Sequence, residues 1–217
     1  MKHSLVQNSM VKNGLLLALF AMLCTGLVAV VDNQTSSRIQ QQQQQELMRV
    51  LHQIFPDALH DNELTEQCTL LQDKDVLGTD SALPAYIGTL QGIPTGIAIE
   101  TIAPDGYNGQ IRIIIGISAS GEVLGVRTLS HQETPGLGDK IELRKSEWVK
   151  GFSGKTIASE EDKAWFVKKD GGEIDQFTGA TITPRAYVKA VRKALLYFNT
   201  NKQVIFSQAL NCGASHE

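Results

Sequence analysis

The longest apolar run in the chain is GLLLALFAMLCTGLVAVV at residues 14–31, and it contains no charged side chain. As an α-helix it would be about 27 Å long, close to the thickness of a bilayer core. Lys2 and Lys12 precede the run and Asp32 follows it. The positive-inside rule therefore predicts a cytoplasmic N-terminus (1–13), a retained transmembrane anchor and an exported remainder. The alternative is a cleaved signal peptide, but the run is longer than usual and no Ala-x-Ala site closes it.

Helical periodicity continues beyond the apolar run. Apolar residues recur at the i, i+3, i+4, i+7 and i+8 spacing of an amphipathic helix: Leu47, Val50, Leu51, Ile54 and Phe55. Pro56 ends this pattern, because proline breaks a helix interior. We therefore predict a helical stalk over 32–56 that leads into an exported domain over 57–217.

The middle of the chain has the alternation of β-strands. Isoleucines occupy every second position from Ile111 to Ile117, as expected of a strand with one face on a core. AYIGTL and TGIAIETI flank QGIP, and IRIIIGIS and EVLGVRTL flank the turn residues 119–121. The pattern predicts an antiparallel meander of about four strands, whereas 57–80 shows no clear pattern.

The last third alternates loops with short periodic segments. We predict a loop over 131–140, a helix over 141–152 and a hairpin turning at 170–172. A final helix is predicted from Pro184, with apolar side chains at helical spacing. The fold class is therefore α+β: a single N-terminal transmembrane helix followed by an exported domain with a largely antiparallel sheet and packed helices.

Charge and cysteines narrow the class of protein. The formal net charge is −3, so nothing indicates a nucleic-acid partner. Cys24 lies in the predicted anchor, whereas Cys68 and Cys212 lie in the exported part, where disulfides persist. We predict that these two cysteines pair; the alternative is two unpaired thiols.

Common catalytic motifs are missing from the sequence. It contains no CxxC, HExxH, P-loop or GxSxG pattern. His131 and Glu133 are two residues apart in a predicted loop, which is a weak metal signal. We therefore predict no metal ion and no catalytic residue.

The stretch DQFTGATITP (175–184) combines a turn with a helix start. Thr183 before Pro184 is typical of an N-cap followed by the first helical turn. Gly179 and Ala180 leave the preceding backbone free of bulk, and a helix N-terminus favours phosphate. The Thr181 hydroxyl thus lies beside a predicted phosphate site. The alternative is a simple glycine turn before a capped helix.

Asp175, Thr178, Gly179, Ala180 and Thr181 form a D-x-x-T-G-A-T pattern. This pattern resembles the flavinylation motif of covalent FMN-binding domains, which occur in the C subunit of the sodium-pumping NADH:quinone oxidoreductase and in the G subunit of the Rnf/Rsx electron transport complex. The resemblance implies an FMN phosphoester on Thr181. It also implies a flavin transferase that uses FAD as donor together with Mg²⁺.

Three further stretches resemble the Rnf/Rsx member of that family: HQETPGLGDKIELR (131–144), APDGY (103–107) and KKDGG (168–172). The loop ETPGLG is our first candidate for flavin contact, through Glu133, Thr134, Gly136 and Leu137. Its alternative is a connector shaped by glycine and proline. The resemblance places the covalent FMN-binding region at about 84–200.

The resemblance implies a function and a location. The chain would be a membrane-anchored electron-transfer subunit of an Rnf/Rsx-type complex in the bacterial inner membrane, with its main domain periplasmic. Its partners would be the other subunits of the complex and, transiently, the flavin transferase, and it would turn over no substrate of its own. The alternatives are a flavoprotein like the C subunit of a sodium-pumping quinone reductase and a noncatalytic exported binding or assembly protein.

Overall fold

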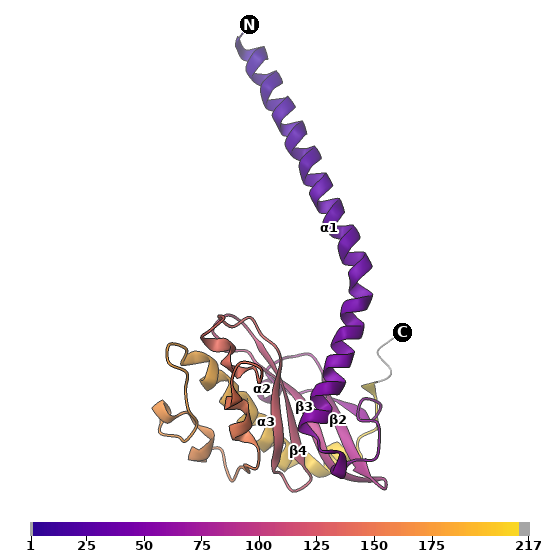
Figure 1. The fold of residues 1–217 in the computed structure, drawn as a ribbon, viewed down its shortest axis with the longest axis vertical. Coiled ribbons are helices and arrows are strands. Elements are labelled where there is room, and N and C mark those ends of the chain that lie inside the picture. Colours follow the sequence, from indigo (N-terminus) through magenta and orange to yellow (C-terminus); the bar gives the residue numbers. More distant parts are fainter. Residues whose placement is uncertain (1, 213–217) are drawn as a thin grey trace. The chain divides into compact units, whose positions relative to one another are not determined.

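A single long helix begins the chain. The computed structural model describes residues 2–212, and α1 runs without a break from Lys2 to Ile54 (Figure 1). Its apolar part is exposed, and the helix is long and apolar enough to cross a membrane. The chain divides into two compact units, Met1–Glu46 and Leu47–Glu217. The end of α1 therefore belongs to the C-terminal unit.

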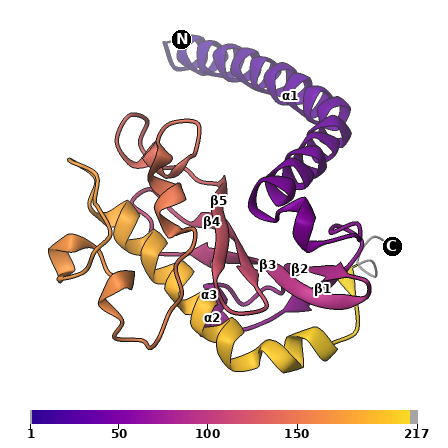
Figure 2. The ribbon, with the colours of Figure 1, turned by 60° about the horizontal axis from the view of Figure 1, so that its bottom comes forward.

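The C-terminal unit is built on an antiparallel sheet. Strands that follow one another in the sequence also lie side by side in this sheet (Figure 2). In the described part of the chain its five strands are β1 (Cys68–Leu71), β2 (Leu83–Leu90), β3 (Ile93–Ala103), β4 (Ile111–Ser118) and β5 (Val123–Ser130). Strands β2–β5 confirm the predicted meander. Strand β1 lies in the stretch for which the sequence made no prediction.

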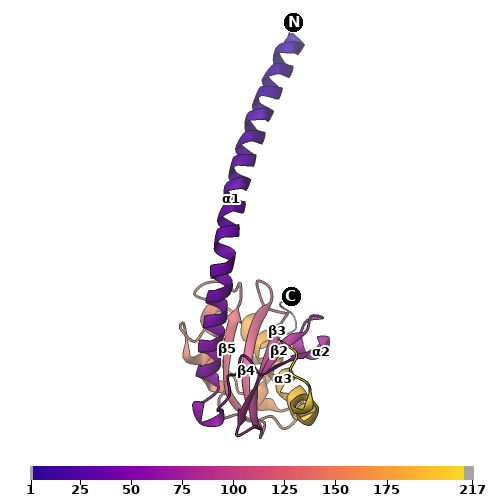
Figure 3. The same ribbon diagram turned by 90° about the vertical axis from the view of Figure 1, so that its right-hand side faces the viewer.

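The two faces of the sheet are covered by different helices (Figure 3). The long helix α3 (Ile182–Ser207) packs on one face, in a core that includes Ile113 and Ile115. The end of α1 packs on the other face, where Phe55 is fully buried. A Cβ on Gly88 would lie 2.4 Å from the Phe55 ring, and one on Gly96 would lie 2.9 Å from it. These glycines therefore let the Phe55 ring approach the strands closely.

A disulfide joins the C-terminal end of the described chain to the first strand. Cys68 and Cys212 are bonded, with their Cα atoms 5.6 Å apart, which confirms the predicted pairing. Beside the bond, the N–H of Asn211 donates to the carbonyl of Cys68 at 3.1 Å. Two short elements complete this region, a 3₁₀ turn at Asp57–Leu59 and the helix α2 at Lys74–Leu77.

The predicted helix over 141–152 is wrong. Within that range the structure has a 3₁₀ segment only at Glu147–Phe152, and another, Gly138–Ile141, ends where the predicted helix would begin. Residues 142–146 separate them; the last of these, Ser146, is extended, and its hydroxyl accepts from the N–H of Trp148 at 3.2 Å. Serine favours such local capping bonds over a helix interior, so the apolar periodicity alone was misleading.

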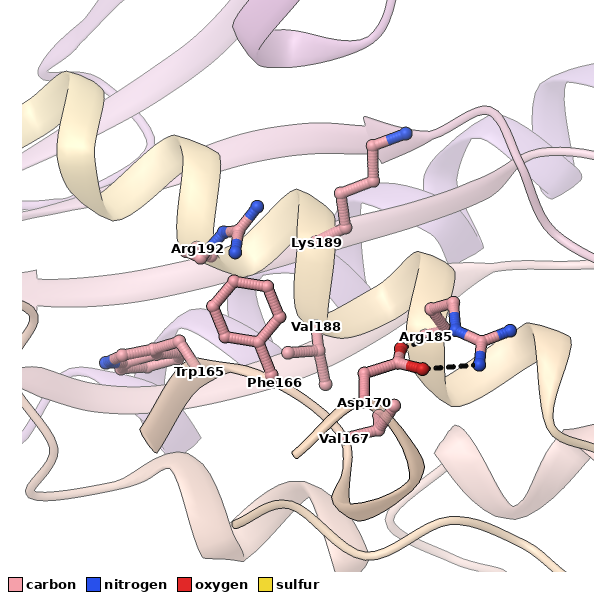
Figure 4. Close-up of a pocket in the computed structure, with 8 residues that line it drawn as sticks. All are labelled: Trp165, Phe166, Val167, Asp170, Arg185, Val188, Lys189 and Arg192. Atoms are coloured by element: carbon pink, nitrogen blue, oxygen red, sulfur yellow. Dashed lines mark hydrogen bonds and ion pairs between the residues drawn. The ribbon is translucent and has the colours of Figure 1, made fainter. Parts of the chain in front are cut away.

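The predicted hairpin at 170–172 is also wrong. Two 3₁₀ turns, Lys163–Trp165 and Lys168–Asp170, replace the strands, and only a single bridge links Val167 to Ile174. Contacts with α3 hold this segment instead (Figure 4): Asp170 accepts from Arg185 at 2.6 and 2.8 Å, and the Arg192 guanidinium lies 4.3 Å from the centre of the Phe166 ring. The segment is therefore held by side-chain contacts with α3 and not by the backbone hydrogen bonds of a hairpin.

Candidate functional site

The helix α3 begins two residues earlier than expected. Its N-cap is Thr181, whose side chain makes no capping hydrogen bond, so the prediction of Thr183 as N-cap is wrong. Thr183 lies inside the first turn and is 1% exposed. Its hydroxyl donates to the carboxylate of Glu133. A tertiary acceptor has therefore drawn the Thr183 side chain away from the helix terminus.

Glu133 connects three segments of the site. It is 4% exposed, and while Oε2 accepts from Thr183, Oε1 accepts from the N–H of Asn108 at 3.2 Å. A Cβ on Gly106 would lie 2.9 Å from Oε1, and one on Gly138 would lie 2.8 Å from Oε2. The two glycines therefore allow the loops before β4 and after β5 to close around this carboxylate.

A cavity of about 240 Å³ lies at the start of α3. Its lining residues are Tyr107, Glu133, Thr134, Leu137, Gly138, Gly179, Ala180, Thr181, Ile182 and Thr183. The structure thus brings together six of the nine residues expected around the cofactor, and it leaves Gly136, Asp175 and Thr178 outside the lining. Tyr107 was not predicted as a site residue, although it ends the APDGY stretch that carried part of the resemblance.

Thr181 offers an unused hydroxyl at this cavity. Within residues 2–212 its side chain has no hydrogen-bond partner, and no acceptor binds the backbone N–H of Ile182 or Thr183. Gly179 adopts a φ of +84°, a conformation that favours glycine, and a Cβ there would lie 3.3 Å from Leu137. Free N–H groups at the positive end of a 26-residue helix favour an anion such as phosphate.

The neighbouring loop after β5 is held by its own polar contacts. The N–H of Gly136 donates to Asp139 at 2.8 Å, and this bond lowers the pKa of the Asp139 carboxyl. His131 bonds Glu142 through Nε2 at 2.8 Å, and its Nδ1 accepts from the N–H of Glu133 at 3.0 Å. Burial by itself would raise the pKa of Glu142. Hydrogen bonds from Arg144 and His131 have the larger combined effect, so the pKa of Glu142 lies below its usual value. The predicted flavin loop is therefore rigidly supported.

Asp175 lies outside the cavity and its carboxylate is exposed. It pairs with Lys168 at 2.5 Å, and its backbone carbonyl accepts from Trp148 Nε1 at 2.9 Å. Trp148 packs edge-on against Phe177 and Tyr187, with ring centres 5.1 and 5.4 Å apart. Trp148 therefore anchors the motif loop to the core.

The cavity suits a ligand with a phosphate at one end and a flat apolar ring at the other. The free N–H groups and the Thr181 hydroxyl are donors of the kind that a phosphate accepts. Beside them, Tyr107, Leu137 and Ile182 expose 68%, 42% and 45% of their surface. A flavin mononucleotide has this chemistry, so the residues present fit that group.

Comparison with known proteins agrees with this fit. Residues 106–196 match the FMN-binding domain, and residues 1–54 match the RnfG N-terminal region. The fold and the site thus define an FMN-binding domain that follows an N-terminal helix able to span a membrane.

Full-length relatives identify the family. The chain is 69% identical over 212 residues to the G subunit of the ion-translocating oxidoreductase complex of Shewanella baltica, an alignment that covers 98% of this chain and all of the relative. It is 67% identical, with the same coverage, to the G subunit from Shewanella oneidensis. It is 56% identical over 206 residues to the G subunit from Vibrio atlanticus, covering 95% and 98% of the two chains. The chain belongs to the family formed by the G subunits of ion-translocating oxidoreductase complexes.

Proposed function

We propose that the chain carries FMN covalently, through a phosphoester on Thr181, and uses it to relay electrons between other subunits of its complex. As a member of its family, the chain is a membrane-associated FMN electron-transfer subunit of an ion-translocating oxidoreductase complex. The observation that supports the attachment point is the Thr181 hydroxyl, which faces the cavity without a partner among residues 2–212.

The attachment reaction is a group transfer. Thr181 Oγ1 forms a bond to the FMN phosphorus of FAD, the pyrophosphate bridge of FAD breaks, and AMP leaves while the hydroxyl proton is released. A flavin transferase, with Mg²⁺, would catalyse this step on the exposed motif. Once bound, the isoalloxazine ring accepts one or two electrons. A covalent link keeps the site filled where free FMN is scarce, because noncovalent occupancy depends on ligand concentration.

The residues of this chain have separate tasks in the proposal. The N–H groups of Ile182 and Thr183 and the positive end of α3 stabilise the phosphate. Thr134 and Leu137 from the loop after β5 contact the flavin, and Gly136 shapes that loop. Glu133 lines the same cavity but acts mainly by holding Thr183 in place, because both carboxylate oxygens already accept hydrogen bonds.

The motif residues outside the cavity serve recognition by the transferase. Asp175 and Thr178 are exposed, so an enzyme can reach them. Gly179 and Ala180 let that enzyme approach the Thr181 backbone closely. Replacing Asp175 should therefore lower the extent of attachment without removing the acceptor oxygen.

We also propose the orientation in the membrane. Residues 1–13 are cytoplasmic, 14–31 cross the bacterial inner membrane, 32–56 form the stalk, and 57–217 lie in the periplasm with the FMN-binding region at about 84–200. The lysines before the apolar run support this orientation. A periplasm-specific reporter fused after the last residue should be active; activity of a cytoplasm-specific reporter there would refute the orientation.

The attachment is tested by intact mass after coexpression with the flavin transferase. The wild-type chain should gain the mass of one FMN, and the Thr181→Ala variant should gain none, because alanine offers no oxygen to phosphorus. Thr178→Ala is the matched control: it removes a hydroxyl from the same motif but leaves the Thr181 oxygen in place, so at least part of this variant should still gain FMN. Asp175→Ala should be modified only in part. A Thr181→Ala chain that still gains the mass of FMN, or a wild type that never does, would refute the proposal.

A further inference from the structure

A cluster of metal-ligating side chains lies far along the sequence from the flavin motif, where α1 ends. His52 is in the last turn of α1, Asp57 begins the following 3₁₀ turn, and His60 follows that turn. One ligand atom from each of the three lies within 4.8 Å of the others. We propose that His52, Asp57 and His60 bind one divalent transition-metal ion, with zinc as the reference ion. The site is independent of the flavin and goes beyond the function proposed above.

The ligand types and spacing suit this ion. Two imidazoles and one carboxylate are ligands that zinc takes in sites that also keep a water position. Tetrahedral zinc with bonds of about 2.0–2.1 Å places its ligand atoms about 3.3 Å apart. His52 Nδ1 and Asp57 Oδ1 are already 3.7 Å apart. The side chains of His52 and Asp57 are 54% and 90% exposed, so both are free to close the remaining distance by rotation.

The backbone that carries the ligands is held in place by the fold. Phe55 and Ile54 are buried on the sheet and fix the last turn of α1. Pro56 ends that helix, and its carbonyl accepts from the N–H of Leu59 at 2.9 Å. After the ligands, the N–H of Asp61 donates to β2 at 2.8 Å. An ion would therefore meet a preformed turn, which reduces the ordering that binding requires.

His60 has the supporting contacts of a metal ligand. Its Nδ1 lies 3.2 Å from the carbonyl oxygen of Pro56, and in the tautomer that donates to this carbonyl, Nε2 keeps its lone pair for a metal. The edge of its ring packs on Phe55, with centres 5.5 Å apart. The ring centre of His52 lies 5.9 Å from that of His60. The two imidazoles therefore lie side by side, one of them fixed by a buried aromatic ring and a backbone carbonyl.

Metal binding at this point would tie the end of α1 to the first segment of the domain. His52 lies on the helix, whereas Asp57 and His60 lie beyond the proline that ends it. A bound ion would cross-link the two segments and oppose fraying of the last helical turn. We therefore expect zinc to raise the melting temperature of the protein.

The experiment titrates Zn²⁺ into the full chain in detergent micelles, after metal removal and in competition with a chromophoric chelator. A Cys24→Ser background removes the exposed free thiol. We expect one ion per chain, with at least about tenfold weaker binding in each of His52→Gln, Asp57→Asn and His60→Gln. Glu63→Gln is the matched control, because it removes a nearby exposed carboxylate outside the cluster, and its affinity should equal that of the background chain.

Two further measurements complete the test. Co²⁺ should give visible absorption bands of a four- or five-coordinate site in the background chain and lose them in the His60→Gln variant. Circular dichroism without metal should give the same melting temperature for all variants, which separates lost binding from lost folding. Absence of saturable binding, or equal affinity in the three ligand variants and the Glu63→Gln control, would overturn the proposal.

Discussion

Two threonines separated by one residue should respond to the same substitution in opposite ways. Thr181→Val and Thr183→Val each replace a hydroxyl by a methyl group of similar size. Thr181 has no hydrogen-bond partner within residues 2–212, whereas the buried Thr183 hydroxyl donates to Glu133. We expect Thr181→Val to abolish flavin attachment with little change in stability. Thr183→Val should destabilise the fold and leave the attachment oxygen in place.

The size of the Thr183 effect follows from its acceptor. A hydrogen bond to a charged group contributes about 1.5–3 kcal/mol, and the acceptor here is a carboxylate that is 4% exposed. Asn108 continues to donate to Glu133 at 3.2 Å, so the carboxylate keeps one partner. We therefore expect a loss of about 2 kcal/mol in the free energy of unfolding. For a domain of this size that corresponds to a fall of about 4–8 °C in melting temperature.

The assay combines equilibrium denaturation of the flavin-free proteins with intact mass after coexpression with the transferase. Loss of a helix cap at Thr183 would also cost about 1 kcal/mol, so the size of the effect alone does not identify the contact. The double variant Thr183→Val with Glu133→Gln distinguishes the two roles. If the hydroxyl acts through Glu133, the two changes are non-additive. Additive losses, or a Thr183→Val variant as stable as wild type, would refute the assigned contact.

Three other predictions concern stability. Cys68 and Cys212 are 144 residues apart in sequence, and reduction of the disulfide between them should lower the free energy of unfolding by at most about 4–5 kcal/mol. Labelling of two exported thiols in unreduced, unfolded protein would contradict the bond. Burial raises the pKa of Glu100 despite its 2.6 Å bond from Arg112, so its ionised form is disfavoured in the folded state. Stability should therefore fall as pH rises from the ordinary glutamate range through the raised pKa, and denaturation at several pH values should show this slope reduced in Glu100→Gln; equal slopes would contradict it. Gly138→Ala should cost about 1–3 kcal/mol in chemical denaturation, because the new Cβ would lie 2.8 Å from Glu133 Oε2; a stability equal to wild type would show that the loop yields.

Local patterns were sufficient for the two long helices and for strands β2–β5, and a local motif singled out the threonine proposed to carry the flavin. Alternating isoleucines predicted β4, and turn residues predicted the hairpins on both sides of it, because neighbouring strands in a meander need only short connections. The helix α3 was also expected, since its apolar residues keep helical spacing over many turns. The D-x-x-T-G-A-T pattern singled out Thr181, which the structure places on the cavity wall.

Local patterns failed where distant side chains decide the conformation. Residues 170–172 have the turn signal of a hairpin, but the flanking segments form 3₁₀ turns, and Asp170 pairs with Arg185 on α3. Thr183 has the sequence context of a cap, but its hydroxyl donates to Glu133, fifty residues earlier, whose buried carboxylate needs hydrogen-bond donors. Neither partner is visible within a window of neighbouring residues.

The sequence by itself determined the apolar helix, the order of the strands, the family and the threonine proposed to carry the flavin, because each depends on residues that are close together in the chain. Only the tertiary structure decided which residues meet. It closed two loops and the start of α3 around Glu133, placed Tyr107 and Thr181 on the wall of one cavity, and brought His60 next to His52. The physical reason is burial. A carboxylate or hydroxyl removed from water needs a hydrogen-bond partner, and the folded chain provides one that is near in space even when it is far away in the sequence.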